Sequence, residues 1–237
     1  MTIWVPLISA LLGAIIGSVS AYLGNLLLET QKRKYETYTK LNGKKRILGQ
    51  IYFSLITERV ICLRIEVFKE KCGKASDPTV SYELKRHAEL ADKFQFELNE
   101  CYSDILELLS SIELVFKRSD LLYQKINTII KLNEAVNDDQ EKMMNFFRED
   151  FSKTISAIRP IIDIKPMQDG ITIKTTYNTK ELVSTMNPVF QKSMKYVGDY
   201  INTHIQWPFD DLLIDLKNEI KGKDNEALQA WRVQISP

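Results

Sequence analysis

The first 28 residues of the chain carry no charged side chain, and their large and small residues lie on opposite sides of one helix. At about 100° per residue, residues 8–25 divide into two halves of roughly 180° each. The bulky half holds Ile8, Leu11, Leu12, Ile15, Ile16, Val19, Tyr22 and Leu23. At about 1.5 Å per residue, this helix is long enough to cross a hydrocarbon core of about 30 Å. Residues 1–28 are therefore predicted to form a transmembrane helix.

The small half of this helix predicts self-association. Small side chains let a second helix backbone approach closely, as in the pair Gly13-x-x-x-Gly17. We assign packing to Ala10, Gly13, Ala14, Gly17, Ala21 and Gly24, while Ser9, Ser18, Ser20 and Asn25 are candidates to line a lumen. The small face is wide enough for a neighbour on each side, which favours a cyclic homo-oligomer. A simple dimer and a monomeric anchor remain as alternatives.

The charges that follow the apolar stretch predict its orientation. A secretory signal carries its positive charge before the apolar region, and a buried core helix rarely needs so long an uncharged run. Here seven Lys and Arg residues and two Glu residues fall within residues 29–46. Such residues favour the cytoplasmic side of a span. We therefore expect a single-pass protein of the inner membrane, with its N-terminus outside and its C-terminus in the cytoplasm.

Residues 29–46 are predicted to be a basic juxtamembrane segment at the lipid surface. The membrane-surface residues would be Lys32, Arg33, Lys34, Lys40, Lys44, Lys45 and Arg46. Because the formal net charge of the whole chain is +1, the rest of the chain is slightly acidic. Direct binding of nucleic acid is therefore not expected. The three cysteines show no CxxC spacing, which is typical of a reducing compartment.

Residues 47–237 are predicted to form a cytoplasmic antiparallel helical bundle, so the fold class is all-α. Apolar residues recur at helical spacing up to about residue 71, over 79–116, over 120–158 and over 180–221. Expected core residues are Phe94, Ile105, Ile129, Phe147 and Phe151. A small β-hairpin or an ordered flap is predicted at 161–178, where isoleucines alternate with polar residues. Residues 224–237 are expected to hold one short helix.

The breaks and caps of these helices are also predicted from residue type. Gly43 and Gly49 are expected to bend or break the first helix, and residues 137–139 to interrupt the third. Ser119 or Asp120 is the expected cap of the third helix, and Thr179 of the fourth. The fourth is expected to restart at Pro188 and to kink or restart at Pro208.

The sequence contains no motif for catalysis, phosphate binding or metal binding. His87 is expected on the surface, and His204 as a hydrogen-bonded packing residue. Four carboxylates at helical spacing are interpreted as a solvated helix face; they are Asp210, Asp211, Asp215 and Glu219. We therefore assign no catalytic residue, cofactor or metal, and we do not expect an enzyme.

The stretch from Ile8 to Leu41, followed by a helical domain, resembles small bacterial single-pass membrane proteins of phage-defence systems. The nearest architecture is that of the pore-forming membrane accessory of type VI-B CRISPR systems. That resemblance covers the first 41 residues and the general layout, and it implies assembly into a ring and pore formation. The HEPN-like Arg/His pair of that accessory is absent from this sequence.

Two function classes follow from these observations. In the first, the protein is a membrane-anchored homo-oligomeric effector that forms a pore or perturbs the membrane in bacterial antiviral defence. In the second, it is a non-enzymatic scaffold or sensor at the inner membrane whose helical domain recruits a protein partner. Both need the lipid bilayer as a partner, so the anchor does not separate them.

Overall fold

The computed structural model describes the backbone of residues 4–72, 78–167, 170–176 and 178–235, and the side chains of residues 13–70, 78–162, 178 and 180–222. Its first element is α1 (Trp4–Cys72), one continuous helix of 69 residues. Of the bends or breaks predicted at Gly43 and Gly49, a break is wrong at both positions. A glycine costs a helix only about 1 kcal/mol, and the buried side chains of Leu41, Leu48 and Tyr52 hold α1 in place around both glycines.

Two further long helices follow, α2 (Pro78–Val115) and α3 (Asp120–Ser156). Ser119 is the N-cap of α3, as predicted, and its hydroxyl oxygen accepts a hydrogen bond from the Leu122 N–H. The predicted interruption at residues 137–139 is wrong. Val136 and Gln140 on either side are both buried, so packing holds the helix together through this polar stretch.

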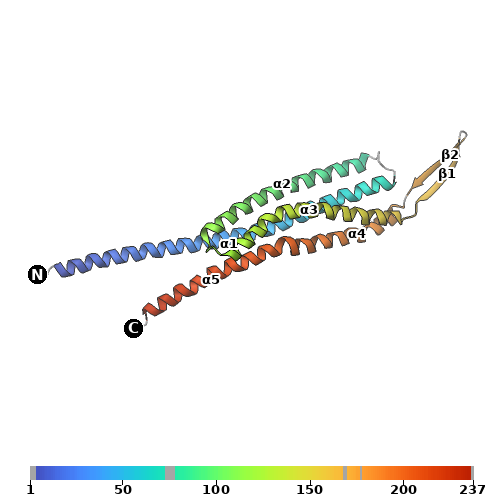
Figure 1. The fold of residues 1–237 in the computed structure, drawn as a ribbon. Coiled ribbons are helices and arrows are strands. Elements are labelled where there is room, and N and C mark those ends of the chain that lie inside the picture. The colour runs from blue at the N-terminus through green and yellow to red at the C-terminus, as the bar shows by residue number, and fades with distance from the viewer. Residues whose placement is uncertain (1–3, 73–77, 168–169, 177, 236–237) are drawn as a thin grey trace.

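The predicted hairpin is confirmed as strands β1 (Ile161–Met167) and β2 (Gly170–Thr176). The two strands are antiparallel, and Ile164 lies opposite Ile173. Figure 1 shows the hairpin projecting from the end of the molecule that lies away from both chain termini.

The chain returns through three consecutive helical segments, α4 (Thr179–Tyr200), the π-helix η1 (Ile201–Gln206) and α5 (Trp207–Ile235). Asn178, and not Thr179, caps α4, because its side chain accepts hydrogen bonds from the backbone of residues 180 and 181. Pro188 lies inside α4, so the predicted restart there is wrong. Residues 224–235 continue α5 and form no separate helix.

The predicted irregularity before Pro208 takes the form of the π-helix. Proline lacks an N–H and its ring collides with the carbonyl four residues earlier in an α-helix. In the structure the Trp207 N–H donates to the carbonyl of Asn202, which is the i→i+5 bond of a π-turn. The wider turn accommodates Pro208 without ending the helical rod.

The protein is all-α in its main body, with four helical rods packed as an antiparallel bundle (Figure 1). Ile105, Ile129, Phe147 and Phe151 are fully buried, as predicted, whereas Phe94 is only partly buried against the core. Within the described residues, no helix contains a stretch long and apolar enough to cross a membrane. The first twelve residues of the predicted span lie outside the described side chains.

Candidate functional site: the projecting arm of α1 and the base of the bundle

Helix α1 extends beyond the bundle as a projecting arm, which we define as residues 13–33 (Figure 1). Every side chain from residue 13 to residue 30 is exposed, and Lys34 is the first buried one. Eight of the exposed residues are large and hydrophobic: Ile15, Ile16, Val19, Tyr22, Leu23, Leu26, Leu27 and Leu28. Burying one such side chain is worth about 1.5–3 kcal/mol. The arm is therefore an apolar surface that nothing else in the described chain covers.

The predicted packing residues lie on the other side of the arm. A Cβ atom added at Gly13, Gly17 or Gly24 would meet no atom within 4 Å, and Ala14 and Ala21 are exposed as well. Ala10 lies outside the described side chains. The described members of this set therefore have no packing role against other described parts of the chain.

The predicted lumen residues are equally free of tertiary contacts where they are described. Ser18, Ser20 and Asn25 are exposed, and Ser9 lies outside the described side chains. The Ser18 hydroxyl donates to the Ala14 carbonyl at 2.8 Å, and Thr30 bonds to Leu26 in the same way. Both hydroxyls are satisfied within their own helix, which lowers the cost of placing them in an apolar environment.

The seven basic residues of the predicted membrane-surface segment separate into two groups. Lys32, Arg33, Lys40 and Arg46 are exposed to solvent. Lys34, Lys44 and Lys45, which are also assigned to the lipid surface, each pair with a carboxylate of another helix. The helical phase of α1 turns these three lysines toward its neighbours.

Lys34 marks the base of the bundle, the end from which the arm projects. Its side chain is 3% exposed, and its Nζ lies 2.5 Å from a carboxylate oxygen of Glu219 on α5. The same Nζ lies 4.9 Å from the centre of the Phe116 ring. Glu219 also accepts a hydrogen bond from the backbone N–H of Lys117. The first residue after the arm is thus attached both to α5 and to the α2–α3 turn.

The carboxylates of α5 that we interpreted as a solvated face all form ion pairs between helices. Asp210 pairs with Lys45 of α1 at 2.5 Å. Asp211 and Asp215 lie 3.1 and 2.6 Å from the Nζ of Lys125 on α3. Burial disfavours the charge of Lys125, but its hydrogen bonds to Asp215 and Asp211 outweigh this effect and raise its pKa. Sequence spacing showed the acidic row, whereas its lysine partners come from distant helices.

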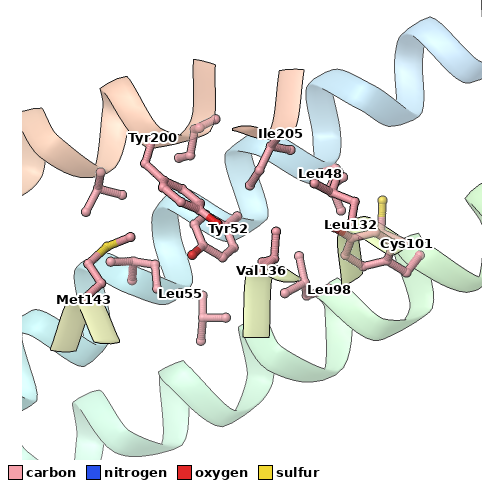
Figure 2. Packing of buried hydrophobic residues seen from close by; sticks show 14 of the residues in the cluster. Leu48, Tyr52, Leu55, Leu98, Cys101, Leu132, Val136, Met143, Tyr200 and Ile205 are labelled. Atoms are coloured by element: carbon pink, nitrogen blue, oxygen red, sulfur yellow. The ribbon is translucent and has the colours of Figure 1, made fainter. Parts of the chain in front are cut away.

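A second cluster of polar side chains lies in the middle of the bundle and includes Tyr52, Tyr102, Tyr200 and Asp139. The ring of Tyr52 stacks on that of Tyr200 with 6.0 Å between centres, among the aliphatic residues of the core (Figure 2). Tyr200 donates a hydrogen bond to Asp139 at 2.9 Å. The hydroxyl oxygens of Tyr52 and Tyr102 are buried and have no partner among the described residues. Burial raises the pKa of all three tyrosines well above the usual value.

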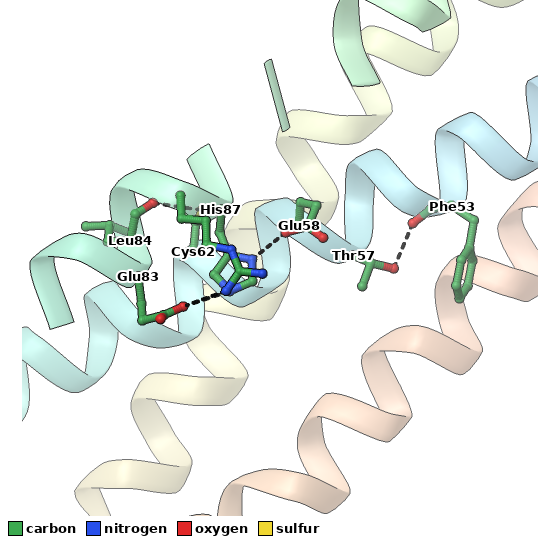
Figure 3. A network of polar contacts seen from close by, with 8 residues as sticks. Phe53, Thr57, Glu58, Cys62, Glu83, Leu84 and His87 are labelled. Carbon is green, nitrogen blue, oxygen red and sulfur yellow. Dashed lines mark hydrogen bonds and ion pairs between the residues drawn. The ribbon is translucent and has the colours of Figure 1, made fainter. Parts of the chain in front are cut away.

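The two histidines differ from their predicted settings. His87, expected on the surface, is only partly exposed: its side chain is 19% exposed, and its Nδ1 lies 2.5 Å from Glu58 on α1 (Figure 3). Its Nε2 lies 3.7 Å from Glu83. His204 is exposed and stacks on Tyr200, and no hydrogen bond of its side chain is found among the described residues. The thiol of Cys62, which Figure 3 shows beside His87, is partly buried, and this burial raises its pKa to about 11.

The described residues contain no group of three or more His, Cys, Asp or Glu side chains that could hold a metal ion. The features that remain as a candidate site are the uncovered apolar arm and the base to which it is attached. No protein-family model matches the chain, and comparison with curated proteins and with solved structures found no relative.

Proposed function

We propose that the protein is a membrane-anchored homo-oligomeric effector that permeabilises the membrane in which its arm lies. The observation that carries this proposal is the uncovered apolar arm. The backbone of α1 is helical from Trp4, so the uncharged stretch up to Leu28 is one helix of roughly 37 Å. A hydrocarbon core of about 30 Å would cover its bulky side chains.

Self-association is supported by the small residues of the arm. Because no described residue lies within 4 Å of a Cβ atom added at Gly13, Gly17 or Gly24, these glycines are open to another copy of the same helix. The resemblance to defence accessories adds a setting, namely the cytoplasmic membrane of a bacterium, with the bundle in the cytoplasm. In this arrangement the bundle controls how the arms assemble or open.

Gly17→Leu is the sharpest test of this function. A Cβ atom added at position 17 meets nothing within 4 Å and the side chains around it are exposed, so the bundle is expected to fold normally. Leucine is also favourable in a bilayer, so the arm should still insert. The variant is expected to lose the crosslinked ladder of oligomers in membranes and the leakage of ions or dye on expression. Ile15→Leu, on the bulky half, is the matched control and should retain both.

A second candidate function is supported by the hairpin. Strands β1 and β2 form a two-stranded sheet at the end of the bundle opposite the arm (Figure 1). Such a hairpin is marginal by itself and is suited to adding a strand from a partner. If the protein is an anchored scaffold, leakage will be absent from the wild type. Deletion of residues 161–176 will then abolish partner recruitment and leave membrane location unchanged.

A further inference from the structure

The α2–α3 turn, residues 116–119, lies at the base of the bundle beside the start of the arm. Phe116 contacts Lys34, and the Lys117 N–H bonds to Glu219 at 3.1 Å. Lys34 lies six residues after Leu28, where the uncharged stretch of residues 1–28 ends, and this is roughly 9 Å along the helix. The contacts therefore fix the turn at about the height of a membrane surface around Leu28.

Two leucines at the two sides of this turn point away from the core. Leu114, at the end of α2, is 82% exposed, the highest value among the large hydrophobic side chains that the structure describes. Leu121, at the start of α3, is 56% exposed. Their neighbours Ile112 and Leu122 are buried in the usual way, so the helices themselves are well packed here. The exposed leucines are an apolar surface that the fold does not use.

The tip of the turn carries two cations. Lys117 and Arg118 are exposed, and their side chains form no ion pair with any described residue. Glu113 and Asp120 lie just outside them, so the turn as a whole is neutral. Net attraction to anionic lipid therefore does not explain the surface. Long basic side chains beside leucines suit a lipid interface, because their charged ends reach the headgroups while their stems lie on apolar surface.

We propose that the α2–α3 turn is a second membrane contact, in which Leu114 and Leu121 enter the interface of the same leaflet that the arm crosses. This inference rests on the proposed membrane anchoring of the arm. The bilayer is the expected occupant because the turn and the apolar arm project from the same end of the bundle. With the arm and the turn both in the leaflet, the bundle would be held at a fixed tilt to the membrane.

The test uses the full-length protein in vesicles, with an environment-sensitive NBD label on a single cysteine. The background variant has Cys62, Cys72 and Cys101 replaced by alanine, and labels are placed through Leu114→Cys, Leu121→Cys or Tyr82→Cys. Tyr82 is the matched control, because it is 66% exposed but lies near the other end of α2. Vesicles carry either plain lipid or lipid with a nitroxide quencher near the headgroup.

Labels at positions 114 and 121 are expected to shift to the blue and to lose fluorescence with the lipid quencher, whereas the label at position 82 does neither. A blue shift at 114 without lipid quenching would mean that a second copy of the chain covers the leucines, and the inference would be wrong. Unshifted, unquenched labels at 114 and 121 would also overturn it. Flotation with vesicles and resistance to alkaline extraction report separately on the arm, so failure of the proposed anchoring is recognised on its own.

Discussion

Lys34 of α1 and Glu219 of α5 form a 2.5 Å ion pair at the base of the bundle, and the Lys34 side chain is only 3% exposed, against 24% for that of Glu219. The pair joins two residues that are 185 positions apart in the chain. It therefore fixes where the bundle ends and the arm begins.

Replacing Glu219 and replacing Lys34 are expected to lower the free energy of unfolding by different amounts. Glu219→Ala leaves a buried ammonium with no carboxylate, which typically costs about 3–5 kcal/mol of unfolding free energy. Lys34→Met should lower the unfolding free energy clearly less. The methionine side chain still packs on Phe116, and the Glu219 carboxylate, which is partly exposed, still reaches water. Urea unfolding of the full chain in detergent, followed by circular dichroism, measures both. Equal losses for Glu219→Ala and for the exposed control Lys32→Met would contradict the role of the pair.

Phe146 and Phe147 are a matched pair for testing the core. Phe147 is 1% exposed and Phe146 is 48% exposed, although they are adjacent in α3. Phe147→Ala is expected to lower the unfolding free energy by about 3–5 kcal/mol through cavity formation. Phe146→Ala should lower it by much less. The same urea experiment gives both values, and similar losses would show that the phase of α3 differs from that described.

Gly43 and Gly49 should respond differently to alanine. A Cβ atom at Gly43 meets nothing within 4 Å, so Gly43→Ala is expected to stabilise the helix by about 0.5–1 kcal/mol. At Gly49 the added Cβ would lie 3.1 Å from the side-chain nitrogen of Gln206 and 3.4 Å from Ile201. Gly49→Ala should therefore raise the stability less than Gly43→Ala does, or should lower it. Thermal unfolding distinguishes the two, and a larger gain at position 49 would argue against the contact with η1.

Alkaline pH is expected to destabilise the bundle through its tyrosines. Burial raises the pKa of Tyr52, Tyr102 and Tyr200, with the hydrogen bond to Asp139 adding to the effect at Tyr200. In the unfolded chain tyrosine loses its proton near pH 10. The stability contributed by these groups is therefore complete below about pH 10 and falls as the pH rises through their folded pKa values. Unfolding free energies measured from pH 9 to 12 should fall more steeply for the wild type than for Tyr200→Phe.

The orientation of the arm is tested by its exposed charges. Lys32→Glu, Arg33→Glu and Lys40→Glu reverse the basic segment and leave Lys34 in the bundle. This triple variant is expected to insert poorly or in mixed orientation, because basic residues favour the cytoplasmic side. A reporter fused after Pro237 should be active in the cytoplasm for the wild type. Alkaline phosphatase activity from the wild-type fusion would reverse the proposed topology.

Helix boundaries were predictable where the signal was local. The periodicity of α2, the Ser119 cap and the alternation in the hairpin depend on residues within a few positions of one another, and the structure confirms them. Breaks were overestimated at Gly43, at residues 137–139 and at Pro188. Helix propensity is a weak influence, and the burial of flanking residues outweighs it in a long bundle.

The candidate site was predictable only in part for a related physical reason. A lysine that follows an apolar span looks the same in sequence whether it faces lipid or another helix. The helical phase of α1 and the position of α5 decide that Lys34 and Lys45 face carboxylates. The exposure of Leu114 could likewise not be predicted from the sequence. Apolar residues lie near it in the chain, and only packing decides which of them is covered.

By itself the sequence determined the helical rods, the hairpin and the uncharged stretch with small and large residues on opposite sides, because these depend on spacing along one segment. The tertiary structure decided which acidic residues of α5 pair with which lysines, where the bundle ends, and that the α2–α3 turn lies beside the arm. Those relationships join residues far apart in the chain. Their partners are chosen by the packing of whole helices, which buries one face of each helix and leaves the other uncovered.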